Sequence, residues 1–281
     1  MEKEEWTDVI RSRTKWFDFH LEQIWQFRDL LFLFVKRDFI AVYKQTLLGP
    51  LWFFLQPIFS TLIYTVIFGR IAKIPTDSIP PALFYMTGIT AWNYFSDCIG
   101  RTSSTFVSNA GIFGKVYFPR MIVPLSNVIS SLMKFGIQFA MLLAFITFYY
   151  YKGANVHPNA WVLLTPLLIV IMAGMGLGFG IIISSLTTKY RDLSYFMGFG
   201  VQLLMYATPI VYPLSIVHGK LRIISMLNPM TPIVEIFKNA FLGGGEINLP
   251  HLGYSFIVMI FLLFFGLLLF NKIEKSFMDT V

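Results

Sequence analysis

Hydrophobic residues run in long uninterrupted stretches along most of the chain, separated by short polar segments. About 20 apolar residues are needed for a helix to cross the roughly 30 Å hydrocarbon core of a bilayer. By this criterion the pattern predicts six spans, at 51–71, 82–105, 121–150, 160–186, 193–213 and 251–271. We therefore expect an all-α integral membrane protein, with an N-terminal region 1–50, a six-span domain 51–271 and a cytoplasmic tail 272–281.

The region before the first span has a different pattern. Residues 1–18 are polar and are expected at the surface, whereas hydrophobic side chains recur at three- and four-residue steps over 19–36, namely Leu21, Ile24, Trp25, Leu31 and Val35. This spacing predicts an amphipathic helix lying in the membrane interface. A basic segment follows from Lys36 to Lys44, and Gly49-Pro50 then marks a bend into the first span, because proline is tolerated at a helix start.

Two connecting segments are long enough to have structure of their own. The first is the inner loop 106–120. The second, 213–250, holds two moderately apolar pieces divided at Asn228-Pro229, and the second piece ends at Gly243. Since each piece is too short to span, we expect re-entrant or interfacial helices on the outer side.

Composition supports a membrane protein and gives it an orientation. Of 281 residues, 56% are hydrophobic and 13% charged, against about 25% charged in soluble domains, and the mean hydropathy is +0.66. With the N-terminus inside, 15 of the 22 Lys and Arg residues fall on the cytoplasmic side. This bias places both termini of a multi-pass membrane protein in the cytoplasm, and it accounts for the net charge of +7 without nucleic acid.

Residues for catalysis are missing from the sequence. The nearest string to a phosphate-binding loop, at 111–116, has the wrong glycine spacing and no Ser or Thr after Lys115. The four His residues are widely spread, without metal-ligand spacing, and the single Cys98 excludes an intrachain disulfide. We therefore expect no enzyme activity, no metal and no cofactor in this chain.

Charged residues inside or near the spans allow two interpretations each. Asp97 and Arg101 are four residues apart and can pair on one helix face, either lining a conduit or its gate or forming a structural pair near the headgroups. Lys134 either reaches toward the interface or faces a water-filled path. Glu235 and Lys238 are expected to form an interfacial pair on the outer side.

Glycines and aromatics also leave alternatives open. Gly174/Gly178 and Gly176/Gly180 form two interleaved GxxxG pairs, which serve packing inside one subunit or a dimer contact. Aromatic residues of the first, second and fifth spans either anchor the protein at the interface or stack on sugar rings in a channel. The candidates for the channel are Trp52, Phe59, Tyr64, Phe68, Tyr85, Trp92, Tyr94, Phe95, Tyr206 and Tyr212.

Four motifs occur in order around the spans: VKRDFIAVYKQTLLGPLWFFLQPI, NAGIFGKVYFPR, KYRDL and LNPMTPIVEIFKNAFLGG. Together they resemble the permease subunit of polysaccharide-exporting type-2 ABC transporters, the family that exports O-antigen, capsule and teichoic acid. The resemblance covers nearly the whole chain.

The resemblance implies a homodimeric channel that lies in the lipid of the bacterial inner membrane. The channel would bind two copies of a separate ABC ATPase, which uses ATP and Mg. Its cargo would be an undecaprenyl-diphosphate-linked glycan. The interface helix 19–45 and the loop 106–120 would receive the motion of the ATPase, and 213–250 would form the outer gate. The residues implied in coupling are Arg28, Asp29, Lys36, Gly114, Tyr117, Phe118 and Pro119. The candidates for the gate and the lipid diphosphate are Arg37, Lys44, Asp97, Arg101, Lys115 and Arg120, whose basic members are otherwise ordinary positive-inside charge.

Other functions remain as alternatives. A type-2 exporter of teichoic acid, a lipid or a drug would share the architecture. A secondary transporter or ion channel would show inverted repeats and buried carboxylates near midspan, and the six predicted spans favour neither. A membrane transferase would show clustered catalytic residues, which this sequence lacks.

Overall fold

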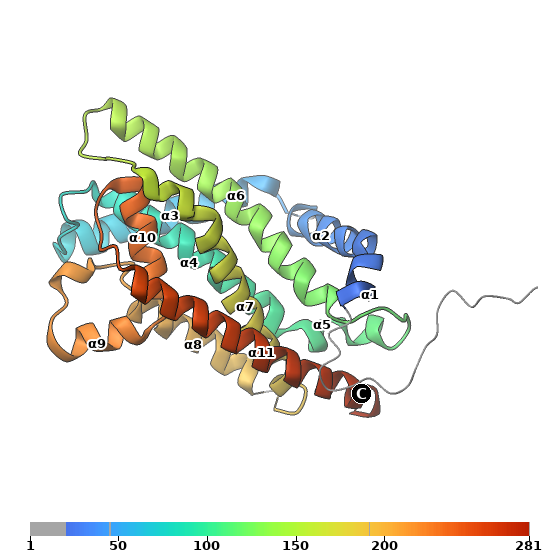
Figure 1. The fold of residues 1–281 in the computed structure, drawn as a ribbon. Coiled ribbons are helices and arrows are strands. Elements are labelled where there is room, and N and C mark those ends of the chain that lie inside the picture. The colour runs from blue at the N-terminus through green and yellow to red at the C-terminus, as the bar shows by residue number, and fades with distance from the viewer. Residues whose placement is uncertain (1–20, 45, 191, 281) are drawn as a thin grey trace, which may run out of the picture.

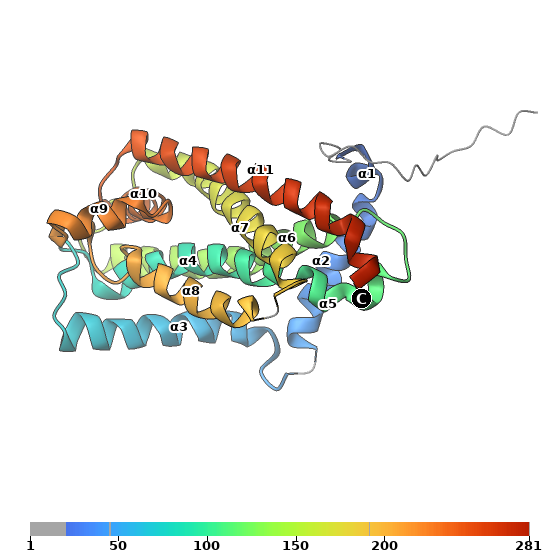
Figure 2. The same cartoon turned by 90° about the horizontal axis from the view of Figure 1, so that it is seen from below.

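The computed structural model describes residues 21–44, 46–190 and 192–280, and all regular structure in these ranges is helical. Four long helices, α4 (Pro81–Ser103), α6 (Ile122–Tyr151), α7 (Thr165–Thr187) and α11 (Leu249–Thr280), lie side by side as a bundle (Figure 1). A continuous run of η1 (Gly49–Leu51), α3 (Trp52–Tyr64) and the π-helix η2 (Thr65–Ile71) lies on one flank, next to α8 (Leu193–Ala207) (Figure 2). The expected all-α class is confirmed.

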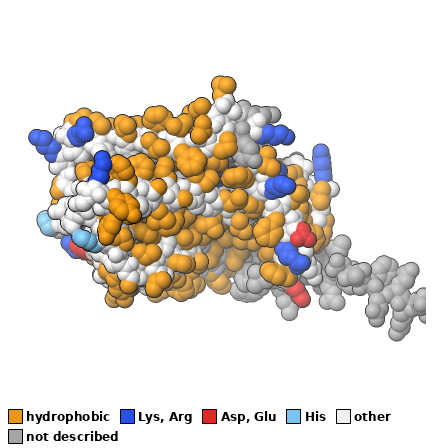
Figure 3. Space-filling view, turned by 90° about the horizontal axis from the view of Figure 1, so that it is seen from above, with side chains coloured by type: hydrophobic (Ala, Val, Ile, Leu, Met, Phe, Trp, Pro, Cys, Tyr) orange, Lys and Arg blue, Asp and Glu red, His pale blue; other side chains and the backbone are white. Residues whose placement is uncertain are grey.

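Short helices gather at the two ends of this bundle (Figures 1 and 2). At one end lie α1 (Leu21–Gln26), α2 (Arg28–Tyr43) and α5 (Thr105–Phe113). At the other lie η3 (Ala160–Leu164), η4 (Leu214–Ile216), α9 (Gly219–Leu227) and α10 (Met230–Leu242). In a space-filling view the charged side chains gather toward these two ends and the middle of the face is hydrophobic, as expected for a bundle that crosses a membrane (Figure 3).

Within the described residues, four helical stretches are long and apolar enough to cross a membrane: Gly49–Ile71, Ile122–Tyr151, Ala160–Thr187 and Leu249–Ile273. The second predicted span forms α4, which is long enough but less hydrophobic than these four. The fifth predicted span forms α8, an apolar helix of 15 residues. The number of six spans therefore stays a prediction.

The fifth predicted span, 193–213, is too long, because α8 ends at Ala207. Thr208 has an extended backbone (φ −93°, ψ 140°) and precedes Pro209. A residue before proline is pushed out of the helical region by contact with the proline ring, so the chain leaves the helix at this position.

The N-terminal helix also differs from the prediction. The expected single helix 19–45 is two helices, α1 and α2, separated at Phe27, while residues 1–20, including the predicted surface segment 1–18, lie outside the described residues. After α2 the backbone turns at Gly49, whose φ of +52° lies in the left-handed region that favours glycine. The expected bend into the first span is thus located at this residue.

The last helix is longer than expected. α11 extends past the predicted span 251–271 as far as Thr280, so 272–280 continues the helix instead of forming a separate segment. The predicted division of 213–250 into two short helices at Asn228-Pro229 is confirmed by α9 and α10, and Gly243 ends α10 with φ +82°.

Close packing around α7 depends on its glycines. A Cβ atom on Gly176 would lie 2.5 Å from Cβ of Cys98 on α4, and one on Gly178 would lie 2.6 Å from the carbonyl carbon of Leu262 on α11. Both glycine pairs therefore pack within one chain, because Gly174 and Gly180 meet Met259 and Thr102 in the same way. Of the two interpretations open from the sequence, the structure supports packing inside the subunit.

Candidate functional site

A ladder of polar side chains joins α4 to α6 across the hydrophobic bundle. Lys134 Nζ lies 2.9 Å from Asp97 Oδ2. One helical turn along, Asn93 Nδ2 donates a hydrogen bond of 3.3 Å to Gln138 Oε1. Because α4 and α6 are antiparallel, steps of four residues in opposite directions keep these pairs in register.

The polar side chains of the ladder are only partly exposed to solvent. The side chains of Lys134 and Asp97 are 18% and 28% exposed, and Gln138 is buried with no partner for Nε2 among the described residues. Charged groups within membrane spans are costly and usually mark pathways for ions or substrates. We therefore regard this ladder, with Asn93, as the polar part of the candidate site.

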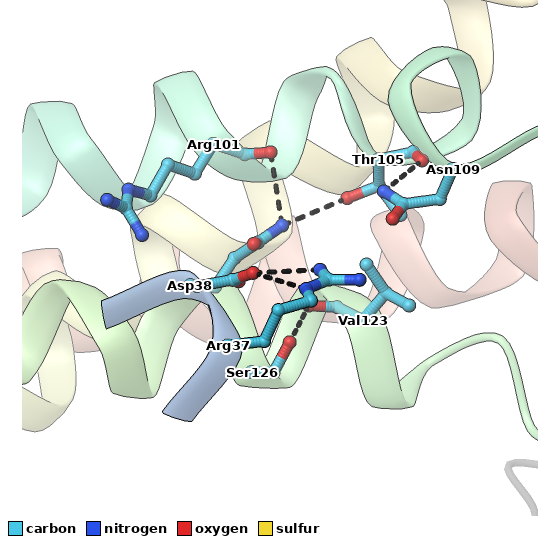
Figure 4. A network of polar contacts seen from close by, with 8 residues as sticks. Arg37, Asp38, Arg101, Thr105, Asn109, Val123 and Ser126 are labelled. Atoms are coloured by element: carbon cyan, nitrogen blue, oxygen red, sulfur yellow. Dashed lines mark hydrogen bonds and ion pairs between the residues drawn. The ribbon is translucent and has the colours of Figure 1, made fainter. Parts of the chain in front are cut away.

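The predicted pairing of Asp97 with Arg101 is wrong. Lys134 reaches Asp97 from the facing helix, while the guanidinium of Arg101 points away from the neighbouring polar network (Figure 4). The two interpretations of Lys134, reaching toward the interface or facing a water-filled path, both stay open, and its ammonium is held by a carboxylate in either case.

The backbone of Arg101 belongs to a second network, at the junction of α4 and α5. Asn127 Nδ2 on α6 donates 3.1 Å to the carbonyl of Arg101 and 3.5 Å to Oγ1 of Thr105 (Figure 4). On the other side, Oγ of Ser184 on α7 accepts 3.2 Å from the N–H of Phe106. These bonds satisfy backbone groups that the break between the helices leaves open, so α5 is held firmly to the bundle.

The proposed diphosphate cations all lie on elements of the end that contains α1, α2 and α5 (Figures 1 and 2). Arg37 on α2 already binds Asp38, with Nη2 2.8 Å and Nε 2.9 Å from Oδ1, and lies 4.6 Å from the ring centroid of Phe34. Lys44 follows α2, and Lys115 lies between α5 and α6. Both are exposed, and neither forms an ion pair within the part of the chain that the structure describes. Arg120 lies 5.7 Å from the ring of Phe113. This end therefore presents positive charge to solvent.

An aromatic cluster, Phe34, Phe113 and Phe118, connects the predicted coupling elements. The ring centroids of Phe34 on α2 and Phe118 are 5.7 Å apart, and those of Phe118 and Phe113 on α5 are 5.8 Å apart. All three rings are buried, and ring pairs at such distances, here one edge-to-face and one tilted, add to the energy of burial. The other predicted coupling residues are exposed or half-buried and lie on α2 or in the loop after α5: Arg28, Asp29, Lys36, Gly114, Tyr117 and Pro119.

The ten predicted channel aromatics divide into two groups. Tyr85, Trp92, Tyr94 and Phe95 on α4 are at most 4% exposed, so their rings offer no free face to a sugar and serve the protein core. Trp52 and Phe59 on α3 and Tyr206 on α8 are exposed, while Tyr64, Phe68 and Tyr212 are half-buried.

Exposed aromatics on α8 were missed by the sequence reasoning. Tyr195, Phe196 and Phe199 are 87%, 64% and 58% exposed and continue toward Leu203 and Tyr206 on the same flank. Their four-residue spacing was a usable signal. Asn93 and Gln138 were also missed, and only the facing of α4 and α6 reveals them.

A buried pair of opposite charges, Glu235 and Lys238, lies at the other end of the bundle. Lys238 on α10 is 1% exposed, donates a hydrogen bond to the carbonyl of Pro209, and lies 3.6 Å from the ring centroid of Phe84 and 3.8 Å from Glu235 Oε1. Glu235 Oε2 accepts 3.1 Å from the N–H of Glu246. The sequence predicted an interfacial pair, but both side chains are buried in the protein.

Burial changes the acid–base chemistry of this pair in opposite directions. It raises the pKa of the Glu235 carboxyl, an effect that Lys238 and the Glu246 N–H partly offset. It lowers the pKa of Lys238 to about 8, although Glu235 acts against the shift. Lys238 therefore links α10 to Phe84 on α4 and to Pro209, which follows α8, at a site that is sensitive to charge.

No group of three or more His, Cys, Asp or Glu side chains that could hold a metal occurs in the described ranges.

Comparison with known proteins gives a consistent result over nearly the whole chain. The family described as ABC-2 type transporter matches residues 29–242. The O-antigen export system permease protein RfbA of Klebsiella pneumoniae is 29% identical over 253 residues, which cover 90% of this chain and 95% of that protein. RfbA of Myxococcus xanthus is 28% identical over 79% of this chain and 83% of its own length. The polysialic acid transport protein KpsM of Escherichia coli is 25% identical over 90% and 95%.

Proposed function

The chain belongs to the ABC-2 type transporter family, and we propose that it is the channel-forming permease subunit of an ATP-driven exporter that moves a lipid-linked polysaccharide across the bacterial inner membrane. The observation that carries this proposal is the similarity, over about nine-tenths of the chain, to permeases named for O-antigen export and for polysialic acid transport. An O-antigen or capsule type of glycan carried on undecaprenyl diphosphate is the cargo that we propose.

Energy for transport comes from a separate subunit in this proposal. The sequence lacks a phosphate-binding loop, and membership of an ABC transporter family implies an ABC ATPase partner. We propose a homodimer of this chain with two ATPase copies on the cytoplasmic side, next to α1, α2 and α5, and with both termini in the cytoplasm. The exposed cations of this end support that orientation.

The aromatic cluster supplies a route by which the ATPase would move the spans. Force on α2 reaches α5 and the start of α6 through the contacts of Phe34 with Phe118 and of Phe118 with Phe113. Force on α2 also reaches α3 through the turn at Gly49. One input would therefore act on two parts of the bundle.

The proposed substrate path begins at the same end. Lys44, Lys115 and Arg120 attract the diphosphate by charge-assisted contacts. The ladder of Asp97 and Lys134 offers hydrogen-bonding groups to sugar hydroxyls. The exposed rings of α3 and α8 would line the channel when two copies face each other, and weak binding at many positions permits movement.

A complementation experiment tests the function. Deletion of the gene should abolish surface polysaccharide, and the wild-type gene should restore it. Unchanged surface glycan, with loss of a different exported lipid or polymer, would transfer the proposal to another cargo of the same family.

A pair of phenylalanine variants tests the coupling route. Phe118→Ala should leave the complex assembled with its ATPase but lower export strongly, because the link between α2 and α5 is lost. Phe148→Ala is the matched control, since this ring is 53% exposed at the opposite end. Equal export by the two variants would refute the route without affecting the cargo assignment.

A further inference from the structure

A cavity of about 410 Å³ lies between α3, α4 and α6, in the half of the bundle away from α2 and α5. A stripe on the flank helix, Ile58, Leu62 and Val66, forms one wall. Ala82 of α4 and Phe145 of α6 lie opposite. Residues four apart follow one helix face, so the stripe makes an elongated groove along α3 and η2.

The lining is hydrocarbon along most of its length. Thr65 also lines the cavity, but its Oγ1 donates 2.7 Å to the carbonyl of Thr61 in its own helix. A threonine that bonds to its own backbone in this way offers mainly its methyl group to a neighbour. The groove is thus suited to an apolar chain.

One end of the groove carries a positive charge. Arg70 lines the cavity from η2, is exposed, and has no ion-pair partner among the described residues. A guanidinium is the side chain best suited to hold a phosphate by paired hydrogen bonds. The combination of an apolar groove and a single terminal cation matches an amphiphile with a phosphate headgroup.

The length of the groove fits one leaflet of a membrane. From Ile58 to Arg70 the helix rises by about 18 Å at roughly 1.5 Å per residue. One leaflet contributes about 15 Å to a hydrocarbon core of about 30 Å. Arg70 therefore lies at headgroup level when Ile58 lies near the midplane.

A protein helix is too large for this cavity. A helix about 10 Å wide and 18 Å long occupies roughly 1,400 Å³, more than three times the cavity volume. A second copy of the chain can therefore cover the groove but not fill it with one of its spans.

We propose that this groove binds a glycerophospholipid of the outer leaflet, with one acyl chain along Ile58, Leu62 and Val66 and the phosphate at Arg70. The leaflet follows from the proposed orientation of the chain, whereas the site itself does not depend on the cargo. The lipid completes the packing of α3 against α6 on a side where the protein leaves a cavity.

Native mass spectrometry of the delipidated, detergent-solubilised protein, titrated with dioleoyl phosphatidylglycerol, tests the site. Arg70→Gln should weaken binding about tenfold, the equivalent of one charge-assisted contact. Lys73→Gln is the matched control, because Lys73 is an exposed cation three residues away that does not line the cavity. It should bind as the wild type does.

A second variant removes the groove and keeps the cation. Ala82→Phe places a ring in the cavity and should weaken binding at least as much as Arg70→Gln, with the oligomeric state unchanged. Equal affinity for Arg70→Gln and Lys73→Gln, or undiminished binding by Ala82→Phe, would overturn the proposal. So would retention of a polyprenyl phosphate in place of a phospholipid in protein purified with its native lipids.

Discussion

Removing the buried ammonium of Lys238 should destabilise the protein more than its position near one end of the bundle suggests. In the variant Lys238→Met the carbonyl of Pro209 loses its donor and Glu235 loses its counter-ion. Breaking a buried ion pair from one side costs about 3–5 kcal/mol. Because Glu235 already has a raised pKa, it can take up a proton, and this limits the cost. We expect about 3 kcal/mol near neutral pH.

A thermal unfolding assay in detergent, followed by tryptophan fluorescence, measures this effect. At about 2 °C per kcal/mol for a chain of this size, the apparent melting temperature should fall by about 6 °C. The penalty should shrink as pH falls, since protonation of Glu235 then removes the unpaired charge. The double variant Glu235→Gln/Lys238→Met should recover most of the loss, because a neutral amide can still accept from the Glu246 N–H.

Two outcomes would refute the reasoning. A melting temperature within about 1 °C of wild type for Lys238→Met would mean that the ammonium does not hold α10. A double variant as unstable as Lys238→Met alone would mean that the loss comes from packing and not from the uncompensated carboxylate.

Three further predictions follow from single contacts. Gly49→Ala should lower export while assembly persists, because a side chain at φ +52° costs about 1 kcal/mol. Gly136→Ala is the control and should export normally, since there is open space around Gly136. Equal export by the two variants would contradict a role for the turn. Asp97→Asn should weaken export and lower stability by about 1 kcal/mol through the loss of the pair with Lys134, and Asp97→Asn/Lys134→Gln should regain stability in the unfolding assay. Raising the pH through 8 to 10.5 should stabilise the wild type relative to Lys238→Met, because over this window the unfolded chain binds the Lys238 proton and the folded chain does not; parallel pH curves would contradict the lowered pKa.

The length of hydrophobic runs predicted the helices well where the need to cross the bilayer alone determines the length of a helix. The spans around α6, α7 and α11 follow from the need for about 20 apolar residues, and the division of α9 from α10 follows from Pro229. The end of α8 at Ala207 was predictable from Pro209 as well, since the residue before a proline leaves the helix. The apolar run beyond Ala207 hid this local signal.

Contacts between helices could not be predicted from one sequence. Spacing on one helix suggested a pair of Asp97 with Arg101. Because α4 and α6 face each other, Asp97 instead forms its ion pair with Lys134. The aromatics of α4 looked like channel residues because composition does not distinguish a ring that faces the core from one that faces a lumen. Tyr85 is buried because α4 also packs against α3 and η2, where its ring meets those of Tyr64 and Phe68.

The distribution of burial identifies the span that is easiest to move. In the most hydrophobic stretch of Gly49–Ile71, 17% of the residues are buried, against 56% for Ala160–Thr187, which includes α7. α7 cannot shift without disturbing the close contacts of its glycines with α4 and α11. The span on α3 is fixed by fewer contacts, and it is also the span that continues from α2 through Gly49. Weakly packed elements move at the lowest free-energy cost, so force applied to α2 should tilt α3 before it disturbs the bundle, and α5, held by Asn127 and Ser184, should transmit rather than absorb it.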